Sequence, residues 1–535
     1  MIKRHRILGA VIALSAVFAA CGGDDDDTDS SDSTETPGGD STDAPGDTVA
    51  PDGTEPAGDA PADGAAITIA LGSEPTSLDP HVVDDGGERA INDNIYETLL
   101  TRDADGALGP GLATELPTQV DDTTWEFKLR DGVTFHDGTP FNADAVVASV
   151  DRIIRLVAEE KTDNSGFYGT LAGATAVDDL TVQITTTGPD GVLPARMYWL
   201  KMVAPGTEAN DDLSDAPNGT GPYTFTGRET GVSIELAANP DYWDGAPSVA
   251  SVRYEFVSEG GTRLAGLKSG KYDLITNLLP NTVDEAPKYE ARQGQEHPLL
   301  ILDADEGITA DANVRMALNL AVDKEALAEA IFSGFAVIDE GQVLSPSILG
   351  YNDSLEAYPY DPDEAARLIE EAGVAGETIT LVGESSGRWL NDRDLVEAVA
   401  GYWTAAGLEV DVQTPEFGAY LDILFNRDSR EDAIFVSSSN DILDPDRQLS
   451  TYYQSGGIGS SNSDAELSAL IDEGRAELDP DARATIYQEA VQIAYDQAYF
   501  VWLVSNQDLY GLSERLTYTP RVDSKLLVKD MSVSG

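Results

Sequence analysis

The chain of 535 residues carries 96 Asp and Glu against 33 Lys and Arg, a formal net charge of -63. This acidity argues against nucleic acid and anionic lipid surfaces as partners, because both attract clustered Lys and Arg. It is also typical of proteins adapted to salt, so a saline habitat is a hypothesis that a stability maximum at low salt would contradict.

Residues 1–20 are expected to be a secretory signal peptide. Three basic residues precede an apolar stretch that is shorter than the roughly 20 residues needed to span a bilayer. The only cysteine, Cys21, follows two alanines, and this context resembles the lipobox of bacterial lipoproteins. The resemblance implies a diacylated Cys21 that anchors the protein to the outer face of the cell membrane, since two buried acyl chains hold a protein stably. The alternative is an ordinary cleaved signal in which Cys21 is incidental.

Residues 21–66 are expected to form a disordered acidic linker. They consist mainly of Asp, Gly, Ser, Thr, Pro and Ala and contain no basic residue. Such a composition buries too little apolar surface to offset the entropy lost on ordering. The linker therefore acts as a spacer between the lipid and the folded part. With Cys21 acylated, no disulfide is possible.

The chain after residue 66 is expected to fold as more than one lobe, because single cores rarely exceed about 250 to 300 residues. Its first elements are a buried strand over 67–71 and a helix over 88–100, where apolar residues recur at intervals of four. A half-buried strand over 125–129 follows, since apolar and charged residues alternate there. Asn142 then caps a helix whose apolar positions have a period of 3.6.

Helices and strands alternate in the second half of the chain. Asp361 and Pro362 are expected to begin a helix that Gly373 ends. The further expected elements are a strand over 379–382, helix 392–406, strand 408–412, helices 464–478 and 480–496, and a buried strand over 499–504. This alternation predicts an α/β lobe whose sheet is covered on both faces.

A series of phrases along this part of the chain carries a family resemblance. In order they are SLDPH, NIYETLL, TWEFKLRDGVTFHDGTPFNADAVVASVDR, NGTGPYTF, NPDYWDG, VRMALNLAVDKEAL, YDPDEAARLIEEAG, GRWLNDRDLVEAVAGYWTAAGLEV and DPDRQL. Together they resemble the family 5 extracytoplasmic solute-binding proteins of ABC transporters, the group that contains dipeptide, oligopeptide and nickel receptors. The resemblance covers nearly all of the chain from residue 67 onward.

The resemblance implies an α/β, two-lobe fold of the periplasmic-binding-protein type (type II), with an extra subdomain inserted in the first lobe. The expected bounds are 67–103, 201–298 and 505–535 for the first lobe, 104–200 for the inserted subdomain and 299–504 for the second lobe. Such a protein is a monomer that closes on its ligand and delivers it to an ABC permease in the membrane. It is not an enzyme and needs no cofactor.

The resemblance implies that Asp441 binds the α-ammonium of a peptide. In peptide-binding members an aspartate precedes an Asp-Pro-Asp motif by three residues, and Asp441 has this offset from Asp444. A carboxylate suits an ammonium because the hydrogen bond between them is charge-assisted. The alternative is that both aspartates cap turns beside Pro445. Ser437 and Ser438 replace the usual Gly-Trp, which implies a larger or more polar pocket and leaves metal chelates and other organic solutes open as ligands.

Three further residues are candidates for contact with the ligand. Arg388 suits a ligand carboxylate, and Trp389 supplies a flat apolar wall. The alternative is a surface arginine stacked on Trp389. Asp84 aligns with a position that contacts the ligand in some oligopeptide receptors, and the alternative there is a solvated loop.

Other conspicuous residues are assigned to the scaffold. His136 and Asp137 suggest a catalytic pair, but they lie in an expected hairpin turn. Gly219 and Gly221 are expected to serve backbone conformation. The histidines are widely spaced, so no metal cluster is expected. A surface hydrolase with paired carboxylates is a third possibility, although the chain lacks a motif such as HExxH.

Overall fold

The computed structural model describes residues 64–83, 86–210, 212–386, 388–460 and 462–534. The chain divides into one unit over Met1–Gly58 and another over Asp59–Gly535, and the description below concerns the second. The signal peptide, Cys21, nearly all of the acidic linker and Asp84 lie outside the described residues.

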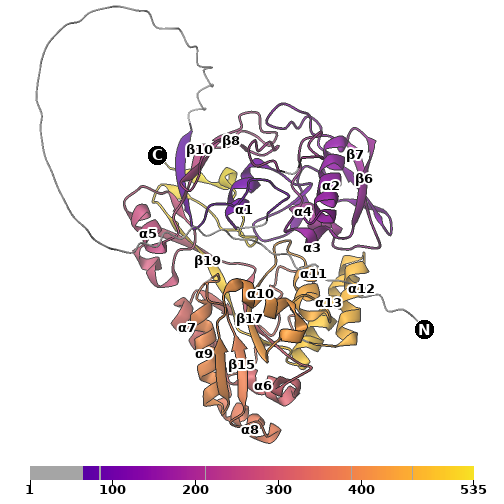
Figure 1. The fold of residues 1–535 in the computed structure, drawn as a ribbon. Helices are drawn as coiled ribbons and strands as arrows, with labels where there is room; N and C mark the ends of the chain where they lie inside the picture. Colours follow the sequence, from indigo (N-terminus) through magenta and orange to yellow (C-terminus); the bar gives the residue numbers. More distant parts are fainter. Residues whose placement is uncertain (1–63, 84–85, 211, 387, 461, 535) are drawn as a thin grey trace, which may run out of the picture. The chain divides into compact units, whose positions relative to one another are not determined.

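An eight-stranded sheet brings together strands from the beginning, middle and end of the folded unit (Figure 1). Its order is β12-β19-β11-β1-β10-β9-β8, and β14 pairs with β19. β1 is parallel to β10 and β11, whereas β19 is antiparallel to β11 and β12. The strands are β1 (Ala65–Leu71), β8 (Tyr223–Glu229), β9 (Ser233–Ala238), β10 (Val249–Phe256), β11 (Leu274–Ile275), β12 (Lys288–Gln293), β14 (Ala336–Ile338) and β19 (Val504–Leu512).

Two helices pack on this sheet, and one of them is shorter than its apolar spacing predicts. These are α1 (Gly86–Ile95) and α5 (Gly260–Lys268). The expected helix to residue 100 ends at Ile95 because the next residues find partners outside a helix. The Glu97 carboxylate accepts hydrogen bonds from Tyr242 and Trp243, and Thr98 forms a β-bridge with Lys201. Leu99 is buried although it lies outside the helix.

A smaller four-stranded sheet with its own core follows in the chain. Its order is β4-β5-β7-β6, and helix α2 packs against it. Asn142 caps α2 as predicted, since its side chain accepts hydrogen bonds from the backbone N–H of Asp144 and Ala145. The elements of this part are β2 (Leu100–Arg102), β3 (Leu108–Pro110), β4 (Thr118–Asp121), β5 (Thr124–Lys128), α2 (Ala143–Ala158), α3 (Ser165–Tyr168), β6 (Leu171–Asp178), β7 (Thr181–Thr186) and α4 (Leu193–Trp199).

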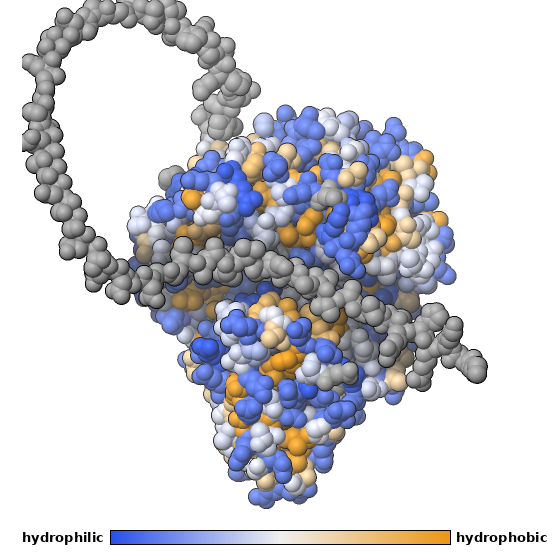
Figure 2. Space-filling view, in the orientation of Figure 1, coloured by the Kyte–Doolittle hydropathy of each residue, from blue (hydrophilic) through white to orange (hydrophobic). Residues whose placement is uncertain are grey.

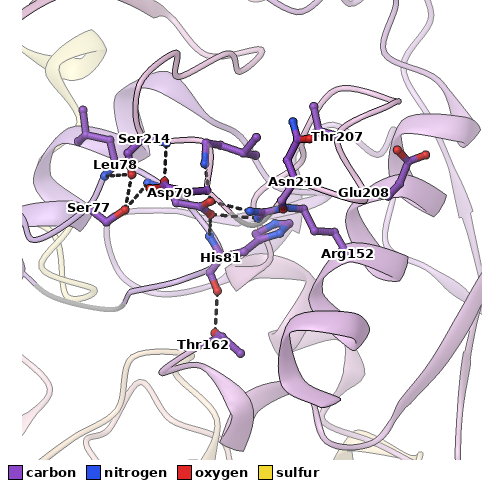
Figure 3. Close-up of polar contacts among 12 residues, drawn as sticks. Ser77, Leu78, Asp79, His81, Arg152, Thr162, Thr207, Glu208, Asn210 and Ser214 are labelled. Atoms are coloured by element: carbon purple, nitrogen blue, oxygen red, sulfur yellow. Dashed lines mark hydrogen bonds and ion pairs between the residues drawn. The ribbon is translucent and has the colours of Figure 1, made fainter. Parts of the chain in front are cut away.

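A buried ion pair fastens this smaller part to the loop after β1 (Figure 3). Arg152 of α2 donates two hydrogen bonds to Asp79, at 3.0 and 2.5 Å, and both side chains are fully buried. Asp79 also accepts from the backbone N–H of His81 and Leu213. The Arg152 Nε donates to the carbonyl of Asn210. Because every charged atom has a partner, this pair can remain ionised away from water.

A five-stranded sheet of order β16-β15-β17-β13-β18 organises the second half of the chain. β15 is parallel to β16 and β17, and β13 is antiparallel to β17 and β18. Successive residues of β13 point to opposite faces, so that Leu300 joins one apolar core and Leu299 the other. The strands are β13 (Glu296–Leu302), β15 (Thr378–Val382), β16 (Glu409–Gln413), β17 (Ala433–Ser439) and β18 (Phe500–Trp502).

Helices cover both faces of this sheet, which confirms the α/β arrangement predicted from the alternation. One core is formed with α6 (Ala312–Leu320), α7 (Lys324–Phe332), α8 (Pro362–Ala372) and α9 (Asp392–Ala405). The other is formed with α10 (Phe417–Phe425), α12 (Ala465–Ala476) and α13 (Pro480–Asp496). Asp361 caps α8, and Gly373 ends it with a φ of 75°, as the sequence predicts.

The chain passes between the two larger sheets at two adjacent crossovers. β12 and β19 end their pairing at Gln293 and Gln507, and β13 and β18 begin theirs at Leu299 and Trp502. The segments 293–299 and 502–507 therefore run side by side between the sheets, and we name them the crossover. The expected lobe bounds at residues 104, 201, 299 and 505 remain predictions.

The described surface is largely polar, and the described helices are short. Figure 2 shows hydrophilic residues over much of the visible face, with smaller apolar patches between them. Among the helices of the described ranges, none combines the length and the hydropathy that crossing a membrane requires.

Candidate ligand-binding cavity

A cavity of about 800 Å³ is lined by residues of both large sheets and of α1. This volume lies within the range of sites for small organic ligands. Three of the residues predicted from the sequence, Arg388, Trp389 and Asp441, line it together, although they come from two separate loops. The remaining candidate, Asp84, lies outside the described residues.

Asp441 lies just beyond β17 and already has cationic neighbours. Its Oδ1 accepts a hydrogen bond of 2.8 Å from the Arg89 Nη1, and Arg447 lies 3.9 Å from its Oδ2. Burial raises the pKa of the Asp441 carboxyl, but the two arginines outweigh burial and hold this pKa below its usual range. Asp441 is therefore ionised with its charge balanced inside the protein. Its role as the ammonium site remains a prediction.

Asp444 has the capping role that the alternative interpretation gives it. Its side chain accepts from the Asp446 backbone N–H at the start of α11 (Pro445–Gln448) and forms two hydrogen bonds with Arg483, at 2.6 and 2.7 Å.

The two serines that replace Gly-Trp differ in whether they reach the cavity. Ser437 lines the cavity, whereas Ser438 is buried and accepts a hydrogen bond from Gln448.

Two acidic side chains hold the backbone of the segment that carries Arg388 and Trp389. The Glu384 carboxylate accepts from the Arg388 N–H at 2.6 Å, and the Asp392 carboxylate accepts from the Trp389 N–H at 3.2 Å. Burial raises the pKa of Asp392 to about 6, with a contribution from its hydrogen bond to Glu384. For Glu384, hydrogen bonds outweigh burial and lower the pKa to about 2. The two carboxyls thus share a proton in mildly acidic solution.

The side chains of this segment present one charged and one aromatic group to the cavity. The Arg388 guanidinium is exposed and lies 4.9 Å from the ring centre of Phe417. Trp389 packs edge-on against Tyr420 and Phe435, with ring centres 6.0 and 5.9 Å away. The alternative interpretation expected Arg388 to stack on Trp389. Arg388 stacks on Phe417 instead. Within the described ranges, Arg388 forms no ion pair, so its charge is available to a ligand.

Four other cavity residues were missed by the sequence analysis. Arg89 lies on α1, Gln295 and Glu296 lie on the crossover, and Asp508 lies on β19. No pattern in the sequence singles out the two acids, because Glu296 begins its strand after polar residues and Asp508 follows three polar residues in β19. No local signal identifies Arg89, because its partner Asp441 is 352 residues away in the chain.

The residues assigned to the scaffold lie outside this cavity. The His136 imidazole forms a 2.9 Å hydrogen bond to the carbonyl of Gly221. Gly219 and Gly221 do not have positive φ, and a Cβ there would lie 2.0 and 2.6 Å from the Ile95 carbonyl oxygen. Close backbone approach, and not an unusual conformation, therefore requires these glycines. Within the described part of the chain, no three His, Cys, Asp or Glu side chains lie together as a metal site would require.

Comparisons with known proteins agree with this geometry. The family described as bacterial extracellular solute-binding proteins, family 5 (middle part), matches residues 107–460. Heme-binding protein A of Haemophilus influenzae is 28% identical and covers 83% of this chain and 87% of its own. The dipeptide-binding protein of Escherichia coli is 27% identical over 73% of this chain and 79% of its own.

A solved structure has a similar fold. The periplasmic binding protein DppA from Helicobacter pylori, in complex with the peptide STSA, has a TM-score of 0.71 and 24% identity, and the match covers 88% of this chain and 98% of that chain. This likeness, with the family match, confirms the expected α/β fold of two lobes.

Proposed function

The chain belongs to the family 5 bacterial extracellular solute-binding proteins, and from that premise we propose that it captures peptides or similar small organic solutes and delivers them to an ABC permease. Proteins of this family bind solutes for ABC importers and are not enzymes. The capture step is proposed to be closure of the two lobes around the ligand, because a closed receptor differs from an open one in the surface that a permease contacts.

The observation that carries this proposal is the cavity of about 800 Å³ between the two large sheets. Arg388 offers a cation, Trp389 an apolar wall and Asp441 a buried carboxylate, so the cavity suits a ligand with both polar and apolar parts. A peptide has these parts. Selectivity then depends on the few polar groups that face the ligand, since burial penalises any of them left unpaired.

We propose that Cys21 is acylated and that the protein is held as a monomer at the outer face of the membrane. The acidic linker lets the receptor stay near its permease, which raises the effective concentration for delivery. Replacement of Cys21 by Ser is expected to release the protein from the membrane fraction, and mass spectrometry of the wild-type protein is expected to find a diacylated N-terminal cysteine. A mature protein without lipid would contradict the anchor.

A metal chelate or another organic solute is the second candidate ligand. Ser437 and Ser438 favour it, because they replace the usual Gly-Trp and so remove an indole, and a relative is named as a heme-binding protein. Calorimetry with nickel chelates and with heme, beside peptides, separates the two candidates. Saturable binding of a chelate in the absence of any peptide response would favour the second.

Thermal shift and tryptophan fluorescence with a peptide library test the first candidate. We expect binding of part of the library, and Asp441→Ala is expected to weaken that binding by about 2 kcal/mol or more if this carboxylate contacts the ligand. Asp284→Asn, a change at an exposed residue outside the cavity, serves as the control and should leave affinity unchanged. If no peptide of the library binds, peptides are excluded as ligands.

A further inference from the structure

Two carboxylates on the crossover side of the cavity have no cation within ion-pair distance among the described residues, and Arg89 acts on Asp508 only from farther away. Apart from Arg388 and Arg263, the other charges that line the cavity are balanced within the protein, in the pairs Arg89–Asp441, Lys525–Asp93 and Asp523–Arg521. Arg263 donates to backbone carbonyls. Glu296 and Asp508 line the same cavity, and within the described part of the chain neither forms an ion pair. The cavity therefore has an excess of negative charge at this one place.

The backbone brings these two acids together. Asp508 pairs with Arg292 in the register of β12 and β19, and both residues are directly adjacent to the crossover segments. Gly294 leaves room for the Asp508 carboxylate, because a Cβ at residue 294 would lie 3.0 Å from the Asp508 Oδ2. Asp508 is also near enough to Glu296 to raise its pKa, although burial is the larger cause. Burial raises the pKa of Asp508 as well.

The amide of Gln295 independently indicates a ligand at this place. Gln295 lines the cavity between Gly294 and Glu296 and is only 7% exposed. Both its Oε1 and its Nε2 are buried without a hydrogen-bond partner among the residues described. A buried amide without partners is destabilising, so such a group in a binding cavity indicates that a ligand supplies the missing donor and acceptor.

We propose that an ammonium group of the ligand binds at the crossover, to Glu296, Asp508 and the side-chain carbonyl of Gln295, and not at Asp441. An ammonium has three donors, and these residues offer three acceptors. This inference rests on the proposed solute-binding function and narrows it to organic amines. Arg388, which lines the same cavity, is available to a carboxylate of the same solute. Since the crossover connects the two sheets, a cation bound there contacts the segment about which the lobes would close.

The experiment compares amines with their blocked forms. The full chain is titrated with a pool of tripeptides that have free amino termini and with the same pool after N-acetylation, and binding is followed by calorimetry and mass spectrometry. The variants are Glu296→Gln with Asp508→Asn, the rival Asp441→Asn, and Asp284→Asn as an exposed control. A pool of uncharged organic solutes and chelates is titrated in parallel.

We expect the wild type to prefer free amines by at least about tenfold over the acetylated pool, and the Glu296→Gln, Asp508→Asn double variant to lose that preference. Asp441→Asn should keep it. When both proteins are free of ligand, the melting temperature of the double variant should be no lower than that of the wild type. The reason is that the variant replaces unpaired buried charges by neutral amides. If Glu296 and Asp508 had a purely structural role, the double variant would instead have a lower melting temperature than the wild type.

Equal binding of both pools, an unchanged preference in the double variant, or loss of the preference in Asp441→Asn would overturn the ammonium site. If the wild type binds only acetylated, uncharged or chelated solutes, the receptor function stands and the ammonium site is wrong. If it binds no solute of any pool, the proposed function fails and the ammonium site fails with it.

Discussion

Arg89 of α1 donates a 2.8 Å hydrogen bond to Asp441, so the carboxylate that the family resemblance assigns to a ligand ammonium already has a cation of the protein beside it. The side chain of Asp441 is 7% exposed and that of Arg89 is 27% exposed. A ligand ammonium at Asp441 would have to compete with a guanidinium that is tethered in place. This competition is the physical reason to look for the ammonium site elsewhere in the cavity.

Replacing Arg89 by Met is expected to lower the free energy of unfolding by about 1 to 3 kcal/mol, because it leaves the Asp441 charge buried with a more distant arginine. The value is below that of a fully buried pair, since Arg89 is partly hydrated. Adding Asp441→Asn to Arg89→Met should recover part of the loss, as measured by urea denaturation. A double variant no more stable than Arg89→Met alone would show that the pair contributes little.

The Asp79–Arg152 pair is expected to matter more, because both side chains are fully buried. Asp79→Asn leaves the Arg152 charge without its counterion and should cost about 3 to 5 kcal/mol of unfolding free energy. Arg367→Met is a matched control, since Arg367 forms a similar two-bonded pair with Glu364 on the surface. The control should change little, because exposed pairs contribute little. Equal losses would contradict the role of burial.

His81 is expected to make the protein sensitive to acid. Burial is the main cause that lowers its pKa to about 4 from 6.5. Below pH 6.5 the unfolded chain binds a proton that the folded protein excludes, so the free energy of unfolding falls between pH 6.5 and 4 by at most about 3 kcal/mol. His81→Gln keeps a donor for the Lys201 carbonyl and cannot titrate. Its stability should fall less over this window, and parallel curves for both proteins would contradict the assignment.

Much of the fold could be predicted because its signals are local. The Asn142 and Asp361 caps and the Gly373 stop depend on residues within one helical turn, and the structure has all three. The helix expected to residue 100 was wrong because a spacing of four cannot show that Glu97 and Thr98 bind groups more than one hundred residues away.

The candidate site was predictable only in part, since its chemistry depends on contacts that are distant in sequence. The resemblance drew attention to Arg388, Trp389 and Asp441, and these line one cavity. It could not reveal that Arg89 balances Asp441, nor that two backbone segments bring Asp508 beside Glu296. Which carboxylate is unpaired is a property of the tertiary structure.

Asp392 is expected to have the opposite pH dependence to His81. Burial raises its pKa to about 6 from 3.8, so the folded protein holds a proton that the unfolded chain has lost. This contribution is present below about pH 4 and is lost as the pH rises through 6. Asp392→Asn cannot lose a proton and should be less destabilised between pH 4 and 6 than the wild type. Asp394→Asn, at an exposed residue of the same helix, is the control. Identical slopes in all three proteins would rule out titration of Asp392.

Gly219 is expected to be intolerant of any side chain. A Cβ at this residue would lie 2.0 Å from the Ile95 carbonyl oxygen, and both atoms belong to backbone that cannot move independently of α1. Gly219→Ala should therefore cost about 2 kcal/mol or more of unfolding free energy, as overpacking does in tightly packed cores.

Gly227→Ala on β8 is the matched control, because its Cβ would meet no atom within 4 Å and its φ is not positive. We expect Gly227→Ala to be neutral or slightly stabilising, since alanine restricts the unfolded chain. Thermal unfolding of the two variants decides between close approach and conformational freedom as the reason for glycine: a tolerated Gly219→Ala would mean that α1 can shift away.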